Sequence, residues 1–128
     1  PGAWRIELSP KRAAAEDLFL NVMQITDRQS SGRWPVRYLD AGERVGCVIE
    51  GPEATWVVLM HKNSQRSAES LRFAVPGQRA ARVLVTDLSP GRWNARREGS
   101  AETVELLVTE DSGAAWFEGP TGVWTLSR

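Results

Sequence analysis

Short apolar runs recur along this chain about every ten residues, and turn-forming residues separate them. In the run from 71 to 75, for example, Leu71, Phe73 and Val75 alternate with less apolar neighbours. Alternation with a period of two places one set of side chains on the buried face of a strand. We therefore predict an all-β fold with little helix, an antiparallel β-sandwich of about ten short strands.

The individual strands are predicted from the apolar runs and the turns between them. Residues 18–25 are almost continuously apolar, which is typical of a strand covered on both faces. Pro35 opens the next run and favours an edge position, because proline cannot donate to a neighbouring strand. The polar stretch 61–70 predicts a mobile loop or at most one helical turn. The predicted strands are residues 4–8, 18–25, 35–39, 45–50, 54–60, 71–75, 82–86, 92–96, 104–109, 115–117 and 123–126.

The length of the chain suits one domain. A chain of 128 residues can bury a core without disulfides or metal ions. The chain does not begin with Met, and its first residues resemble a linker that leads into a strand. We therefore expect residues 1–128 to be a single β-sandwich domain excised from the C-terminus of a larger protein. The expected centre of the core is Leu18, Leu20, Val22, Val57, Leu59, Val83, Val85, Val104 and Leu106.

Charge and hydropathy exclude two classes of partner. Sixteen basic and sixteen acidic residues cancel, so no net field attracts nucleic acid or an anionic membrane surface. No apolar run approaches the roughly 20 residues that a bilayer-spanning helix requires. We therefore expect neither nucleic acid nor a membrane as a partner of this chain.

Residue types that carry out catalysis or bind metals are sparse. Cys47 is the only cysteine and His61 the only histidine, whereas a zinc site takes several such ligands at a recognisable spacing. The sequence has no Gly-x-Ser-x-Gly nucleophile turn and no phosphate-binding glycine loop. Tyr38, the only tyrosine, stands in a predicted edge strand, where we expect it to pack with its hydroxyl in water. We predict no catalytic residue, no metal site and no cofactor, and we expect Cys47 to be buried.

The six tryptophans have more functional potential. An exposed indole can stack on a sugar ring, and Trp34 and Trp93 are the better candidates for exposure because each stands between polar and turn-forming residues. They are the candidate glycan-binding tryptophans, and packing in the core is the alternative for both. The other four lie within regular apolar runs and are expected in the core: Trp4, Trp56, Trp116 and Trp124.

Two arginines join these candidates. Arg92 and Arg96 are expected on the same face of one strand, opposite Trp93. Guanidinium groups bind carboxylates and sulfates through paired hydrogen bonds, so Arg92 and Arg96 are candidates for contact with an anionic glycan. The alternative is a solvated outer sheet face, or a face that docks on another part of a larger protein.

Two sequence patterns point to a known family. The pattern WRIELSP at residues 4–10, followed after a short spacer by EDLFLNVMQITD at residues 16–27, resembles the C-terminal β-domain of heparinase II/III-like polysaccharide lyases. The segment VTDLSPGRW at residues 85–93 resembles a hairpin of the form L-x-G-L-x-P-G-x-Y that is common in such domains. Asp87 stands where glycine is common in that hairpin, and Trp93 where tyrosine is more frequent.

The resemblance implies a role without chemistry. It suggests a non-catalytic C-terminal accessory domain of a secreted or periplasmic bacterial lyase, which braces the catalytic domains through an apolar-plus-arginine face and also touches an anionic glycan. The implied partners are the remainder of the parent chain and an acidic polysaccharide. No catalytic motif of the family is matched, so no catalytic residue is carried over. The alternatives are an independent carbohydrate-binding module and a protein-protein interaction domain.

Overall fold

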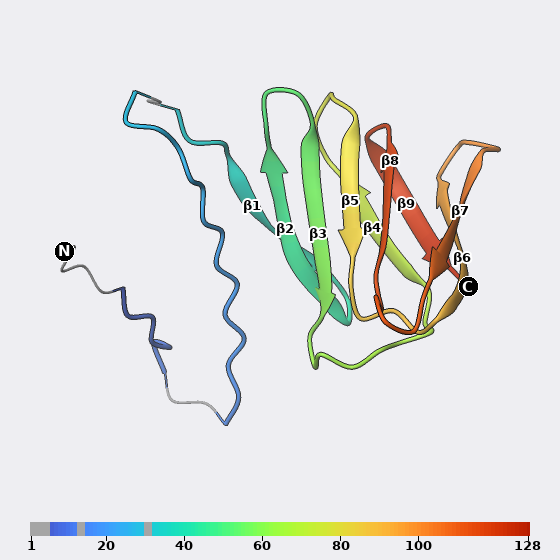
Figure 1. The fold of residues 1–128 in the computed structure, drawn as a ribbon, viewed down its shortest axis with the longest axis horizontal. Helices are drawn as coiled ribbons and strands as arrows, with labels where there is room; N and C mark the ends of the chain where they lie inside the picture. The colour runs from blue at the N-terminus through green and yellow to red at the C-terminus, as the bar shows by residue number, and fades with distance from the viewer. Residues whose placement is uncertain (1–5, 13–14, 30–31) are drawn as a thin grey trace.

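The structure, a computed structural model, describes residues 6–12, 15–29 and 32–128. Within these residues there are nine strands and no helix, in agreement with the predicted all-β class. The strands form one five-stranded and one four-stranded sheet (Figure 1). They are β1 Val36–Ala41, β2 Arg44–Glu50, β3 Thr55–His61, β4 Leu71–Val75, β5 Ala81–Val85, β6 Gly91–Arg97, β7 Thr103–Val108, β8 Ala115–Gly119 and β9 Gly122–Ser127.

The two sheets are connected by crossovers. The five-stranded sheet has the order β1-β2-β3-β5-β8, and the four-stranded sheet has the order β4-β9-β6-β7. All pairs of strands are antiparallel except β3 and β5, which run parallel. Parallel neighbours require a crossover connection, and here the chain crosses to β4 in the other sheet before it returns to β5. As Pro35 suggested, β1 is an edge strand.

The core lies between the two sheets and is built from alternating residues of each strand. Val57 and Leu59 of β3 and Val83 and Val85 of β5 are fully or almost fully buried, which confirms four of the predicted core residues. Val104 and Leu106 of β7 are partly buried and pack against this cluster. The other large side chains of the core are Leu71, Phe73, Leu88, Trp93, Phe117, Trp124 and Leu126.

The prediction of a covered strand at residues 18–25 is wrong for this chain. Leu18 and Val22 are exposed and Leu20 is only half-buried, so none of them joins the core. The segment forms no strand and runs beside the five-stranded sheet without joining it (Figure 1). The physical reason is that strands β1 to β9 fill both faces of the sandwich core between them. Of the strand predicted at 4–8, residues 6–8 are exposed and outside any strand, and Trp4 lies outside the described residues.

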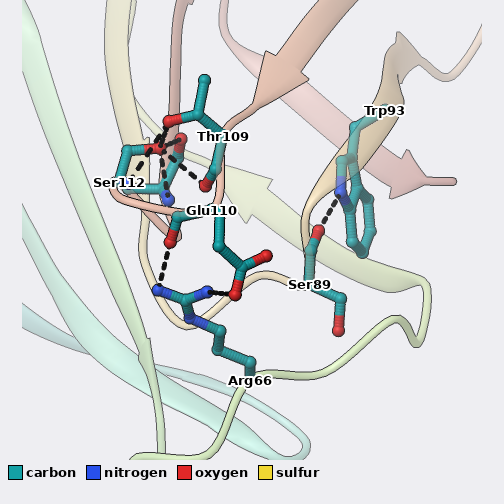
Figure 2. Close-up of polar contacts among 7 residues, drawn as sticks. Arg66, Ser89, Trp93, Thr109, Glu110 and Ser112 are labelled. Atoms are coloured by element: carbon teal, nitrogen blue, oxygen red, sulfur yellow. Dashed lines mark hydrogen bonds and ion pairs between the residues drawn. The ribbon is translucent and has the colours of Figure 1, made fainter.

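The polar connection from β3 to β4 is anchored at its middle and contains no helical turn. Ser67 donates its backbone N–H to the Asp87 carbonyl at 3.0 Å and accepts from the Ser89 N–H at 2.9 Å. Arg66 donates to the backbone carbonyl of Glu110 at 2.6 Å and to its carboxylate at 3.1 Å (Figure 2). These bonds tie the connection to the turns that follow β5 and β7.

The turn after β5 contains a non-glycine residue in a glycine-like conformation. Asp87 has a φ of 56°, in the left-handed region that glycine adopts most easily. Its carboxylate accepts from the His61 N–H at 3.0 Å and from the Thr86 hydroxyl at 2.9 Å. Local hydrogen bonds of this kind let aspartate occupy the left-handed region. The positive φ explains why glycine is common at this place in the hairpin that residues 85–93 resemble.

Candidate interaction surface

The outer face of the four-stranded sheet is largely polar. In register across β4, β9, β6 and β7, Arg72 lies beside Thr125, and Thr125 beside Arg96. A second row runs from Ser127 through Asn94 to Glu105. Arg72 also forms an ion pair of 2.7 Å with Glu98. This face has the side chains of a solvated sheet surface.

The outer face of the five-stranded sheet is mainly apolar and aromatic. The strand register places Val36, Ile49, Trp56 and Arg82 side by side in one row that ends at Glu118. The next row contains Tyr38, Cys47, Val58, Leu84 and Trp116. On β3 and β5 the residues that alternate with these rows are the buried core residues Val57, Leu59, Val83 and Val85. The side chains of the two rows therefore point away from the core. We call this surface the aromatic face: Val36, Tyr38, Ile49, Trp56, Val58, Leu84 and Trp116.

The larger side chains of the aromatic face are open to solvent. Trp116 is 58% exposed and Tyr38 is 66% exposed, while Trp56 and Leu84 are each 39% exposed. Contiguous exposed apolar side chains of this size mark interaction sites more often than single exposed residues do.

The one cation among the two rows, Arg82, is already partnered within the surface. Its guanidinium carbon lies 4.9 Å from the centre of the Trp56 ring, and its Nε donates to the Glu118 carboxylate at 2.9 Å. A guanidinium stacked on an indole presents a flat surface and carries an attraction of about 0.5–1 kcal/mol at an exposed site. Arg82 therefore extends the flat aromatic surface and leaves little unpaired charge on it.

Three predictions for tryptophan need correction. Trp56 and Trp116 were expected in the core but lie on the aromatic face, whereas Trp93, a candidate for exposure, is 0% exposed. The Trp93 indole N–H donates to the Ser89 carbonyl at 2.9 Å (Figure 2). The reason is that alternation predicts which residues share a face and leaves open which face is covered. Trp124 is buried as expected.

The four predicted glycan-binding residues do not come together. Trp34 precedes β1 at one edge of the five-stranded sheet, whereas Arg92 and Arg96 lie on β6 in the other sheet. Arg92 and Arg96 are exposed and lie opposite the buried Trp93, as predicted. Because Trp93 is buried, it cannot stack on a sugar. No single surface therefore holds all four residues.

Of the two candidate tryptophans, Trp34 is the one that the structure leaves accessible. It is 45% exposed and lines a hollow with Arg33 and Arg79. One guanidinium nitrogen of Arg79 donates to the Gly51 carbonyl at 3.1 Å. The hollow therefore combines an aromatic ring with two cationic side chains and with Glu50, whose carboxylate is paired with Arg37.

The residues that could carry chemistry do not share one face, although Tyr38 and Cys47 are neighbours in the register of β1 and β2. Tyr38 points outward from the five-stranded sheet, while His61 belongs to the inward, buried set of β3. Cys47 is buried, and this burial raises the pKa of its thiol above the ordinary range, which favours the unreactive protonated form. In the described part of the chain, no three His, Cys, Asp or Glu side chains are grouped so that they could hold a metal ion. Nor does that part contain a helix long and apolar enough to cross a bilayer.

A buried arginine was missed by the sequence analysis. Arg44 opens β2 and is only 3% exposed, and its guanidinium donates to the carbonyls of Thr86 and Asp87. Burial lowers the pKa of Arg44, while the nearby charge of Asp87 acts in the opposite direction. These bonds fix the start of β2 to the turn after β5, so Arg44 has a structural role. The only sequence signal is an arginine directly before an apolar strand.

The segment before β1 reaches the aromatic face at one end. Residues 22–27 line a hollow together with Ile49 and Trp56. Gln24 donates its side-chain amide to the Trp34 carbonyl at 2.8 Å and accepts from the Trp34 N–H at 2.9 Å. This paired bond fixes the C-terminal part of the segment beside the aromatic face.

Comparison with family models places most of the chain in a known family. The family described as Heparinase II C-terminal domain matches residues 38–128, a range that contains almost all of the nine strands. The match begins after the segment that lies outside the sheets. A search of the curated proteins finds no match for this chain.

Proposed function

The chain belongs to the family of heparinase II C-terminal domains, and on this basis we propose that it braces the catalytic domains of a longer polysaccharide lyase without taking part in the chemistry. The bracing surface in this proposal is the aromatic face. The proposal includes a secreted or periplasmic bacterial location for the longer protein, since acidic polysaccharides are found outside the cytoplasm.

The contrast between the two outer sheet faces is the observation that supports the proposal. One face has the polar composition of an ordinary solvated surface, whereas the other presents Tyr38, Trp56 and Trp116 with aliphatic residues between them. Aromatic residues and arginine are enriched in protein interfaces, and an arginine stacked on tryptophan loses little hydration when a partner covers it. Tyr38 and Cys47 are neighbours in one outer row but His61 is on the inward set of β3, and the burial of Cys47 favours its protonated thiol; these features support a role other than catalysis.

The test uses the longer protein with the aromatic face altered. Replacement of both Trp56 and Trp116 by Ser should lower the melting temperature of the catalytic domains, because it removes the apolar area that they would cover. The turnover number of the lyase should stay close to that of the natural protein. The matched control is Leu107→Ser, since Leu107 is 71% exposed on the polar outer face of the other sheet. A fall in turnover with an unchanged melting temperature would contradict the bracing role.

Contact with an anionic glycan is a second candidate function, and the hollow at Trp34 favours it. An indole beside Arg33 and Arg79 offers stacking to a sugar ring and charge to a carboxylate or sulfate. Titration with uronic-acid oligosaccharides should then shift the tryptophan fluorescence of the natural chain, and Trp34→Ala should abolish the shift. Arg92 and Arg96 form a separate candidate contact, tested by Arg92→Ala and Arg96→Ala in the same titration. Binding that survives all three substitutions would refute both assignments.

Two broader alternatives give different results in these experiments. An independent carbohydrate-binding module would bind oligosaccharide as the 128-residue chain and would leave the stability of the longer protein unchanged. A protein-protein interaction domain with an external partner would be silent in both the glycan titration and the melting experiment.

A further inference from the structure

We propose that residues 18–25 form a strand in the sheet of a neighbouring β-domain of the same longer protein, added at a free edge of that sheet. The inference rests on the proposed function, because it identifies the second element through which the accessory domain is attached. In the assembled protein the segment would be covered on both faces and hydrogen-bonded along its backbone.

The first argument is that this segment has the composition of a buried strand but lacks its surroundings. Leu18, Leu20 and Val22 alternate along one side of the extended chain, and Phe19, Met23 and Ile25 lie on the other. Met23 is 84% exposed and Ile25 is 91% exposed. Apolar side chains on both sides of a strand are typical of strands that lie inside a sandwich or between layers. The exposed run therefore requires cover from outside residues 36–127.

The second argument concerns the backbone. Among the described residues, none forms a backbone-to-backbone hydrogen bond with residues 18–25, and the Gln24 amide is the group of this segment that bonds Trp34. Unpaired N–H and C=O groups in an extended apolar segment are a template for pairing with another strand. Eight residues of extended chain span about 26 Å, which lies within the usual range of strand lengths in globular proteins.

The third argument identifies the partner. The same segment lines a hollow with Ile49 and Trp56 of the aromatic face, and Gln24 fixes it there through Trp34. A body that took up residues 18–25 as a strand would therefore be brought against the aromatic face as well. The matched family range begins only at residue 38, so the segment also lies outside the matched domain. The strand and the aromatic face would then be two parts of one continuous contact with the neighbouring β-domain.

Hydrogen exchange measured by mass spectrometry tests the inference. The amides of residues 18–25 should exchange on the order of a hundredfold more slowly in the longer protein than in the 128-residue chain. Equal exchange in the two proteins would overturn the proposal, as would a natural chain that contains no further β-domain. Slow exchange in the 128-residue chain itself would also overturn it, since the partner would then be a second copy or the free edge of β1.

A pair of proline variants separates strand pairing from a general effect of substitution. Val22→Pro removes one backbone donor in the middle of the proposed strand and should lower the melting temperature of the longer protein. Arg12→Pro places proline in the same exposed segment outside the strand and should leave the melting temperature unchanged. Equal effects would refute the assignment. The bracing function could still hold in that case, because Trp116, which does not line the hollow with residues 22–27, tests it separately.

Discussion

The same substitution at Trp93 and at Trp116 should lower the stability of the 128-residue chain by very different amounts. Trp93 is completely buried, and the part of its indole beyond Cβ removes roughly 150 Å² from water, worth about 4 kcal/mol at ~25 cal/mol per Å². Trp93→Ala also removes the hydrogen bond to the Ser89 carbonyl. The expected loss in the free energy of unfolding is therefore about 3–5 kcal/mol, within the range found for buried tryptophan.

Trp116→Ala is the matched control, because Trp116 is 58% exposed and loses mainly its contact with the neighbouring Leu84. The expected cost is about 1 kcal/mol or less. Urea unfolding followed by circular dichroism gives both free energies from the midpoint and the slope. Similar losses for the two variants, or a larger loss for Trp116→Ala, would refute the assignment of inner and outer faces on which the aromatic face depends.

Three further outcomes follow from local interactions. Arg44→Met should lower the free energy of unfolding by about 1–3 kcal/mol in urea titrations, because it leaves the Thr86 carbonyl without its donor, while the Asp87 carbonyl keeps only the Ser67 N–H. An unchanged midpoint would contradict this. The hydrogen bond from Arg72 lowers the pKa of the Glu98 carboxyl. The stability that this pair contributes is therefore fully present above the pKa that Glu98 has in the unfolded chain, and it is lost as the pH falls through the lower pKa of the folded chain. Arg72→Gln should return the Glu98 pKa, followed by NMR, toward its ordinary range, and an unshifted titration would refute the pairing. Cys47 should react with a thiol-specific reagent only as fast as the chain opens, because burial raises the pKa of its thiol and shields the sulfur from the reagent. Reaction at the rate of an exposed thiol would contradict the burial of Cys47 in the folded chain.

The sandwich itself could be predicted from the sequence because its strands carry strong local signals. The alternation of Leu71, Phe73 and Val75 gives β4, and the Pro90-Gly91 turn separates β5 from β6. Edge position could be predicted for β1 from Pro35. The parallel pairing of β3 with β5 could not, because it results from a crossover between sheets that no local pattern encodes.

The exposed surfaces were harder to predict, for a physical reason. In β8, Ala115 and Phe117 point inward and Trp116 outward, although the indole is the larger apolar group. Size and hydropathy would place Trp116 inside, but the register with β5 decides its face. Likewise, the apolar character of residues 18–25 predicts a covered strand, and the described domain provides no cover for it. Both deviations concern apolar groups on the outside of the sandwich, where the proposed partner would lie.

Solvent access to Trp116 in the longer protein tests the central claim most directly. Hydroxyl-radical footprinting measures oxidation of this side chain, and Leu107 on the polar outer face serves as an internal reference. If the aromatic face is the bracing surface, Trp116 should be oxidised severalfold more slowly in the longer protein than in the 128-residue chain, while oxidation of Leu107 stays the same. Equal oxidation of Trp116 in both proteins would contradict the account.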